Sequence, residues 1–107
     1  PANTAFLSAF QAKTGEAGDI YAVQGYDAGA LLEAGLTATS GDVSARDALF
    51  AAMAGARIDS PRGPLSFSSA HNPIQNIYLR EVRDGRNAFV SVAGEAVRDP
   101  ARGCRLT

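Results

Sequence analysis

The side chain best suited to proton transfer or metal binding is His71, because the chain contains no other histidine. Ser69 and Asn72 lie beside it in the sequence. A nucleophile, a base and an orienting group must converge in space, however, and adjacency along the chain does not achieve this. Two interpretations stay open for His71: a loop residue making local hydrogen bonds, which we favour, or a ligand-binding group.

The other charged side chains offer little chemistry. Glu81 and Asp84 are separated by Arg83, a pattern typical of a solvated hairpin end rather than of paired acid and base groups. Arg62 lies in a Pro-Arg-Gly loop, where it either holds a carboxylate or makes a surface ion pair or turn contact. The phosphate-binding glycine motifs and the GxSxG nucleophile motif do not occur. We therefore expect no enzyme activity, no cofactor and no metal site.

Composition narrows the class of protein further. The chain has 107 residues, of which 46% are apolar and 20% charged, with a formal net charge of −1. Such a composition is typical of a globular protein, and no apolar run reaches the length of a membrane span. The balanced charge gives no electrostatic attraction for nucleic acid. One cysteine, Cys104, excludes an internal disulfide framework and a cysteine-rich zinc site.

Three helices are predicted in the first half of the chain. The first runs from Asn3 or Thr4 to about residue 14, and the second occupies residues 20–39 after a capping Asp19. We expect the second to bury Tyr21, Ala28, Leu31, Leu32 and Leu36, and its glycines to admit a closely packed neighbour. A third helix follows Asp42, with Ser44 and Asp47 as a capping box and with inward-facing residues Val43, Ala48, Leu49, Ala52 and Met53.

Beta structure is predicted in the second half. Residues 60–64 are punctuated like a tight loop, and a short strand follows at Leu65 and Phe67. Residues 74–82 form the clearest strand, residues 84–87 a hairpin loop and residues 88–93 the return strand. Strand 74–82 is apolar on both faces, and so few strands cannot cover three helices. We therefore interpret the chain as part of a larger α/β protein.

Three stretches together carry a family resemblance: residues 21–28 (YAVQGYDA), 60–67 (SPRGPLSF) and 71–82 (HNPIQNIYLREV). In this order and spacing they resemble the C-terminal part of the periplasmic solute-binding proteins of ABC transporters, of the leucine/isoleucine/valine-binding type. The resemblance implies part of a two-lobe type I periplasmic-binding-protein fold. It places residues 1–18 and 74–107 in the C-terminal lobe and residues 19–73 in the N-terminal lobe.

The resemblance also implies a function without chemistry. A small amino acid or an aromatic carboxylate would be captured between the lobes in the periplasm and delivered to a membrane permease. By resemblance, Tyr21 contacts this solute and Gln24 adds a polar contact; alternatively, Tyr21 is an ordinary core residue. Two other functions stay open: a ligand-sensing domain of the same fold in a receptor or regulator, and a free-standing α+β module or small enzyme.

Two further expectations concern partners of the chain. Exposed Ile77, Tyr78, Leu79 and Val82 are expected to pair with the rest of the same polypeptide or with another copy of the fragment. If the protein is exported, Cys104 is expected to form a disulfide with an upstream cysteine; the alternative is an exposed free thiol.

Overall fold

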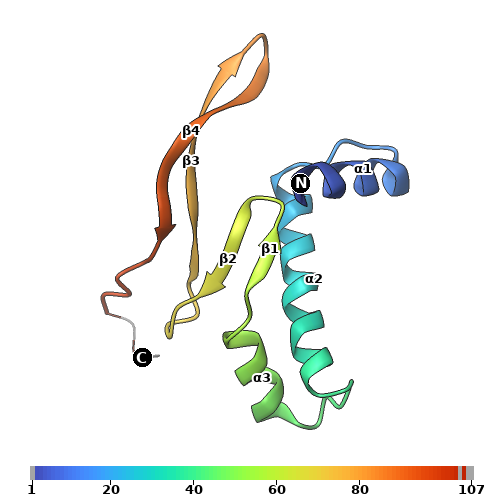
Figure 1. Ribbon diagram of the computed structural model, residues 1–107, viewed down its shortest axis with the longest axis vertical. Coiled ribbons are helices and arrows are strands. Elements are labelled where there is room, and N and C mark those ends of the chain that lie inside the picture. Colours follow the sequence, from blue (N-terminus) through green and yellow to red (C-terminus); the bar gives the residue numbers. More distant parts are fainter. Residues whose placement is uncertain (1, 104, 106–107) are drawn as a thin grey trace.

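The structure is a computed structural model, and it describes residues 2–103 and 105. Three helices come first: α1 (Ala2–Thr14), α2 (Ile20–Ala38) and α3 (Arg46–Ala54). Four strands follow: β1 (Ile58–Ser60), β2 (Gly63–Phe67), β3 (Pro73–Arg83) and β4 (Arg86–Val97). The predicted order of helices followed by a strand and a hairpin is confirmed (Figure 1). Cys104 lies outside the described residues.

Helix α2 begins where the sequence predicts. The Asp19 carboxylate accepts a hydrogen bond of 2.8 Å from the Ala22 N–H, which satisfies one of the free donors of the first turn. The helix then runs for 19 residues and ends at Ala38, one residue earlier than predicted. This cap fixes the register of α2, and with it the positions of Tyr21 and Gln24.

The predicted capping box of α3 is wrong. The Ser44 hydroxyl and the Ser44 N–H both donate to the Asp42 carboxylate, at 2.6 and 2.8 Å, so Ser44 is engaged upstream and α3 begins only at Arg46. These two bonds hold the pKa of Asp42 below its usual value. Val43, expected to face inward, is exposed. Leu49 and Met53 do face inward, and both pack directly on Gly35 of α2.

The strands form one antiparallel sheet in the order β1-β2-β3-β4. β1 was not predicted, because it has three residues and forms only by pairing with β2 across the turn at Pro61 and Arg62. β3 and β4 are joined by Asp84 and Gly85, both with positive φ, the conformation of a type I′ turn. The predicted hairpin is confirmed, although β4 extends four residues beyond the expected end.

The core is small and lies between α2 and the first two strands. Ala56, Ile58 and Leu65 are buried, and their partly buried neighbours are Ala30, Leu31, Ala34 and Phe67. The face of α2 that is buried was predicted only in part: Leu31 packs against the core as expected, whereas Tyr21 and Leu32 are exposed and Val23, Ala30 and Ala34 point inward instead. The prediction was incomplete because α2 is apolar nearly all round, so its sequence does not select one face.

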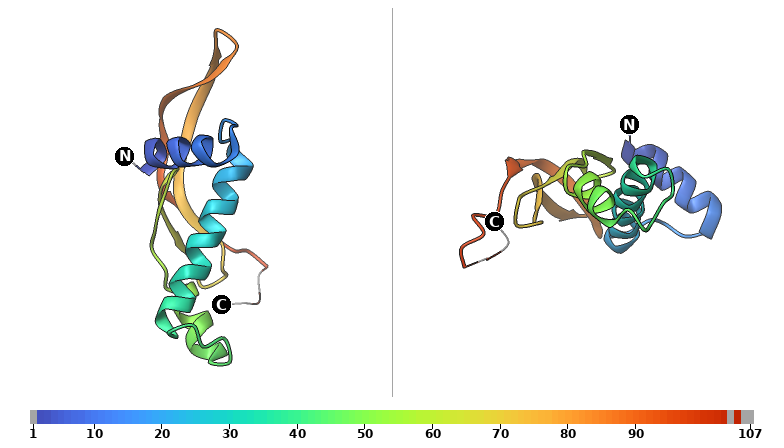
Figure 2. Two further views of the ribbon diagram at one scale, coloured as in Figure 1. Left: turned by 90° about the vertical axis from the view of Figure 1, so that its right-hand side faces the viewer. Right: turned by 90° about the horizontal axis from the view of Figure 1, so that it is seen from below.

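The molecule is extended. Its radius of gyration is 16.1 Å, against about 13 Å for a compact chain of this length. The turn end of the β3–β4 hairpin projects well beyond the other elements (Figures 1 and 2). Large apolar side chains are exposed along both strands of the hairpin, namely Ile77, Leu79, Val82, Phe89, Val90, Val92 and Val97. Among the described residues, no helix has the length and apolar character needed to cross a membrane.

Candidate functional site

Tyr21 and Gln24 lie on the same exposed side of α2, close to its N-terminus. The side chains are three residues apart and are therefore neighbours on the helix surface. Tyr21 is 75% exposed, so the described residues do not bury it in a core. The structure thus brings together the two residues that the resemblance selects, on a surface open to a ligand or to another part of the polypeptide.

From Tyr21 toward the C-terminus of α2, the exposed side of the helix is mostly apolar. We call it the open face of α2, and it consists of Tyr21, Gly25, Ala28, Gly29 and Leu32. A Cβ atom built on Gly25 or on Gly29 would meet nothing within 4 Å. Helices that are apolar all round are normally covered on all sides. The close neighbour that these glycines would admit is therefore not among the described residues.

Arg62 holds a carboxylate, and that carboxylate belongs to Asp27 of α2. Their ion pair measures 2.8 Å, and Asp27 is only 6% exposed. The Tyr78 hydroxyl of β3 donates to the Arg62 carbonyl, so one residue of the β1–β2 turn links α2 to β3. Asp27 Oδ1 and Arg62 Nε are buried without a hydrogen-bond partner among the described residues. The expected surface ion pair is instead a largely buried link between three elements.

The sequence indicates that Arg62 can hold a carboxylate, but it does not indicate that this carboxylate is Asp27. Asp27 and Arg62 are 35 residues apart, and neither belongs to a motif that pairs them. Burial and charge together identify the pair, because an ionised group is rarely buried without a partner of opposite charge. Only the packing of the β1–β2 hairpin against α2 brings the two groups together.

His71 lies in the loop between β2 and β3, with its side chain exposed. Its backbone N–H donates to the Ser68 carbonyl at 2.9 Å, as expected for a loop residue with local hydrogen bonds. The Asn72 side chain donates instead to the Asp99 carboxylate at 3.0 Å. In the described part of the chain, no three His, Cys, Asp or Glu side chains gather closely enough to hold a metal ion.

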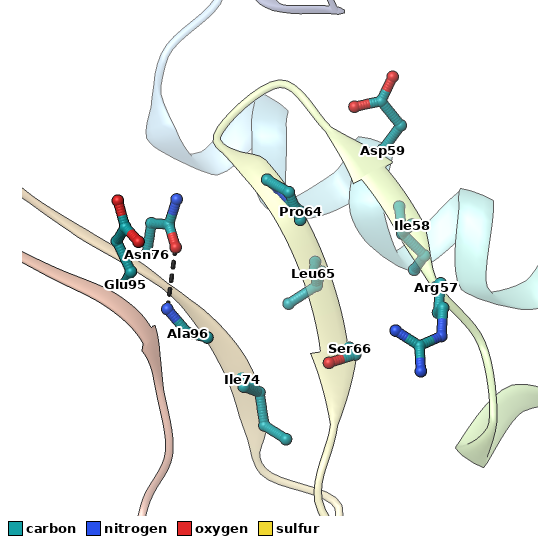
Figure 3. A pocket seen from close by; sticks show the side chains of 10 residues that line it. All are labelled: Arg57, Ile58, Asp59, Pro64, Leu65, Ser66, Ile74, Asn76, Glu95 and Ala96. Atoms are coloured by element: carbon teal, nitrogen blue, oxygen red, sulfur yellow. Dashed lines mark hydrogen bonds between the residues drawn. The ribbon is translucent and has the colours of Figure 1, made fainter. Parts of the chain in front are cut away.

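A groove of about 690 Å³ lies along the sheet (Figure 3). Its charged side chains are Arg57, Asp59 and Glu95, so carboxylates outnumber the guanidinium. The other lining residues are Ile58, Pro64, Leu65, Ser66, Ile74, Asn76 and Ala96. An anionic ligand would meet net repulsion here. A second cavity of about 430 Å³, between α2, α3 and the β2–β3 loop, is mainly apolar, with Phe50, Met53, Phe67 and His71 in its wall.

Residues 1–87 match the periplasmic binding protein family, and the chain belongs to that family. Three solved structures resemble it closely. One is a solute-binding protein of an ABC transporter from R. palustris in complex with benzoate, with 50% sequence identity and a TM-score of 0.91. That match covers 97% of this chain and 29% of the R. palustris chain.

The second is a solute-binding protein from Rhodopseudomonas palustris BisB5 in complex with 3,4-dihydroxybenzoic acid, 35% identical with a TM-score of 0.75. It matches over 92% of this chain and 28% of its own. The third is a substrate-binding protein of an ABC transporter from Sphaerobacter thermophilus, 29% identical with a TM-score of 0.76, over 86% and 26% of the two chains. No curated protein sequence matches significantly. The chain thus spans less than a third of each of these structures.

Proposed function

We propose that this chain is part of the solute-binding component of an ABC transporter, which captures a small aromatic carboxylate in the periplasm and delivers it to the membrane permease. The observation that carries the proposal is the 50% identity, over 97% of this chain, to a solute-binding protein in complex with benzoate. A second relative, 35% identical, is in complex with another aromatic acid. The proposed role is binding and release, without a chemical step.

Tyr21 is the residue that we assign to the solute. Its exposed ring, at the start of α2, provides an aromatic surface that can stack on a benzoate ring. Gln24, one turn further along α2, is assigned a polar contact at the same edge. The relatives in complex with benzoate and with 3,4-dihydroxybenzoic acid favour an aromatic solute over a small amino acid.

The carboxylate of the solute requires a separate anchor. Asp19 already accepts the Ala22 N–H at the N-terminus of α2, which places a negative charge beside Tyr21. Arg62 is occupied by Asp27, and the sheet groove carries more carboxylates than cations. We therefore assign the carboxylate anchor to residues of the longer protein that lie outside this chain.

The function is tested by titrating the full-length protein with benzoate, 3,4-dihydroxybenzoate and leucine in an isothermal calorimeter. We expect micromolar or tighter binding of an aromatic carboxylate, at least about 8 kcal/mol, and no measurable heat with leucine. Benzamide, which has the same ring without the charge, is the matched control and is expected to bind far more weakly. Tight binding of leucine with no binding of either aromatic acid would contradict the proposal.

The same proposal divides the described elements between two lobes. Residues 1–18 and 74–107 are assigned to one lobe and residues 19–73 to the other. In Figure 1, α1 and the turn end of the β3–β4 hairpin lie toward one end of the molecule, and α3 lies at the opposite end. We assign the rest of the same polypeptide as the partner that covers the exposed hairpin and the part of the open face of α2 beyond Tyr21. Pairing with another copy of the fragment is the alternative.

Replacement of Gly29 by alanine tests whether the open face of α2 is covered. In the full-length protein we expect Gly29→Ala to lower the free energy of unfolding by about 1 kcal/mol or more, because an added methyl group overfills a close contact. If the face were open, the same change would stabilise α2 by about 1 kcal/mol through helix propensity. The sign of the change, measured by urea unfolding, therefore decides the question. Ser8→Ala, at an exposed position of α1, is the control and should have an effect within about 0.5 kcal/mol.

A further inference from the structure

Helix α1 buries a single side chain against the rest of the described chain. Phe6 is 7% exposed and is the only buried residue of α1 in the described chain. Its ring lies edge-on to the Tyr26 ring of α2, with 5.3 Å between the ring centroids, and 5.7 Å from the Phe10 ring. Figure 1 and the left view of Figure 2 show α1 lying across the N-terminal end of α2.

The segment that connects α1 to α2 is short and passes directly over this ring. Gly15 has a φ of +76°, which lets the chain turn sharply after α1. Gly18 then presses against Phe6: a Cβ atom placed on Gly18 would lie 2.9 Å from Phe6 Cε1 and 3.3 Å from Leu7 Cδ2. Because Gly18 does not have a positive φ, an alanine there would be opposed by lack of space and not by backbone strain.

The contact lies immediately before the residues assigned to the solute. Asp19 caps α2 directly after Gly18, and Tyr21 follows two residues later. The C-terminal half of α2 packs against α3 at Gly35. Its middle packs against β1 in the core around Ile58. α1 has fewer contacts: the aromatic contact with Tyr26, a small contact with β1 and a connection with two glycines. If α1 changes its orientation relative to Tyr21, Phe6 is the buried contact about which it would turn.

We propose that Phe6, Gly18 and Tyr26 form a pivot between the two lobes and act as positioning residues for solute binding. This inference rests on the proposed function, which assigns α1 and α2 to opposite lobes. Aromatic rings have several favourable relative orientations, from edge-on to offset stacked, so the Phe6 ring can tilt on Tyr26 while keeping much of the contact. The lobes would thus move toward each other around a contact that stays buried, with Gly18 leaving room for the ring.

The experiment adds a methyl group in the space between Gly18 and Phe6 of the full-length protein. We expect Gly18→Ala to weaken benzoate binding about tenfold, because the wedged ring shifts the balance between open and closed lobes. We also expect a changed radius of gyration in small-angle X-ray scattering of the solute-free protein. The relative affinities for benzoate and 3,4-dihydroxybenzoate should stay the same, since the Tyr21 surface is intact. Phe6→Leu, which removes the aromatic contact with Tyr26, should also change both affinity and scattering.

Ala17→Ser, an exposed change in the same connecting segment, is the matched control and should leave both readouts unchanged. The pivot is contradicted if Gly18→Ala lowers the melting temperature while affinity and scattering stay at wild-type values. It is also contradicted if Phe6→Leu leaves both affinity and scattering at wild-type values. Failure of the wild-type protein to bind any aromatic acid would overturn the proposed function instead, and the solute-free scattering would still test the pivot.

Discussion

Replacing Asp27 with alanine is expected to lower the free energy of unfolding of the full-length protein by about 2 to 3 kcal/mol. The change removes the partner of Arg62 and leaves a partly buried guanidinium uncompensated. The expected loss lies below that for a fully buried pair because the Arg62 side chain keeps 32% exposure and water can solvate part of the charge. Urea unfolding monitored by circular dichroism measures the loss.

Two further variants isolate the ion pair. Glu33→Ala removes an exposed carboxylate from the same helix and should change stability by about 0.5 kcal/mol or less. Asp27→Leu/Arg62→Met removes both charges together, and we expect it to be more stable than Asp27→Ala, because no uncompensated charge is left behind. Equal losses for Asp27→Ala and Glu33→Ala would show that the pair contributes nothing.

The second large effect is expected from Tyr21→Ala, which should weaken binding of benzoate to the full-length protein at least about tenfold, or 1.4 kcal/mol. The ring of an aromatic solute would lose an aromatic surface of about 150 to 250 Å² that shields it from water. The melting temperature of the solute-free protein should hardly change, since Tyr21 is 75% exposed and its removal leaves no cavity among the described residues. Calorimetric titration together with a thermal melt measures both quantities.

Tyr21→Phe is the matched control. It keeps the ring and removes only the hydroxyl, so an affinity close to that of the wild type would show that the ring is the part that binds. A large loss of stability in Tyr21→Ala with unaltered affinity would place Tyr21 in the core of the full-length protein. That outcome would support the alternative interpretation, in which Tyr21 is an ordinary core residue.

Local signals predicted most of the secondary structure. The Asp19 cap and the Asp84–Gly85 turn act through neighbouring residues; the cap lies where the sequence indicated, and the turn occupies the first two residues of the predicted loop 84–87. The start of α3 was misplaced because two carboxylates, Asp42 and Asp47, compete for Ser44, and the closer one binds it. Residue types alone do not determine the outcome of such a competition.

Tertiary features were harder to predict. β1 exists through its pairing with β2, and the Asp27–Arg62 pair through the packing of that hairpin on α2, so neither leaves a local pattern. The buried face of α2 was predicted correctly only at Leu31, because the other α2 residues against the core, Ala30 and Ala34, contribute little to an apolar pattern. Tyr21 and Gln24 were selected through the family resemblance, and their role stays a prediction.

The two-residue turn between β3 and β4 has a consequence for the order of events during folding. Every backbone pairing between β3 and β4 can form outward from Asp84 and Gly85, without waiting for a distant part of the chain. Hairpins of this kind form within about 1 to 10 µs, before contacts that require long loops to close. The projecting hairpin can therefore be complete before its apolar side chains are covered. During that interval the hairpin is an uncovered sheet edge with exposed apolar side chains. Chaperones and other copies of the chain would then compete with the rest of the polypeptide for binding to it.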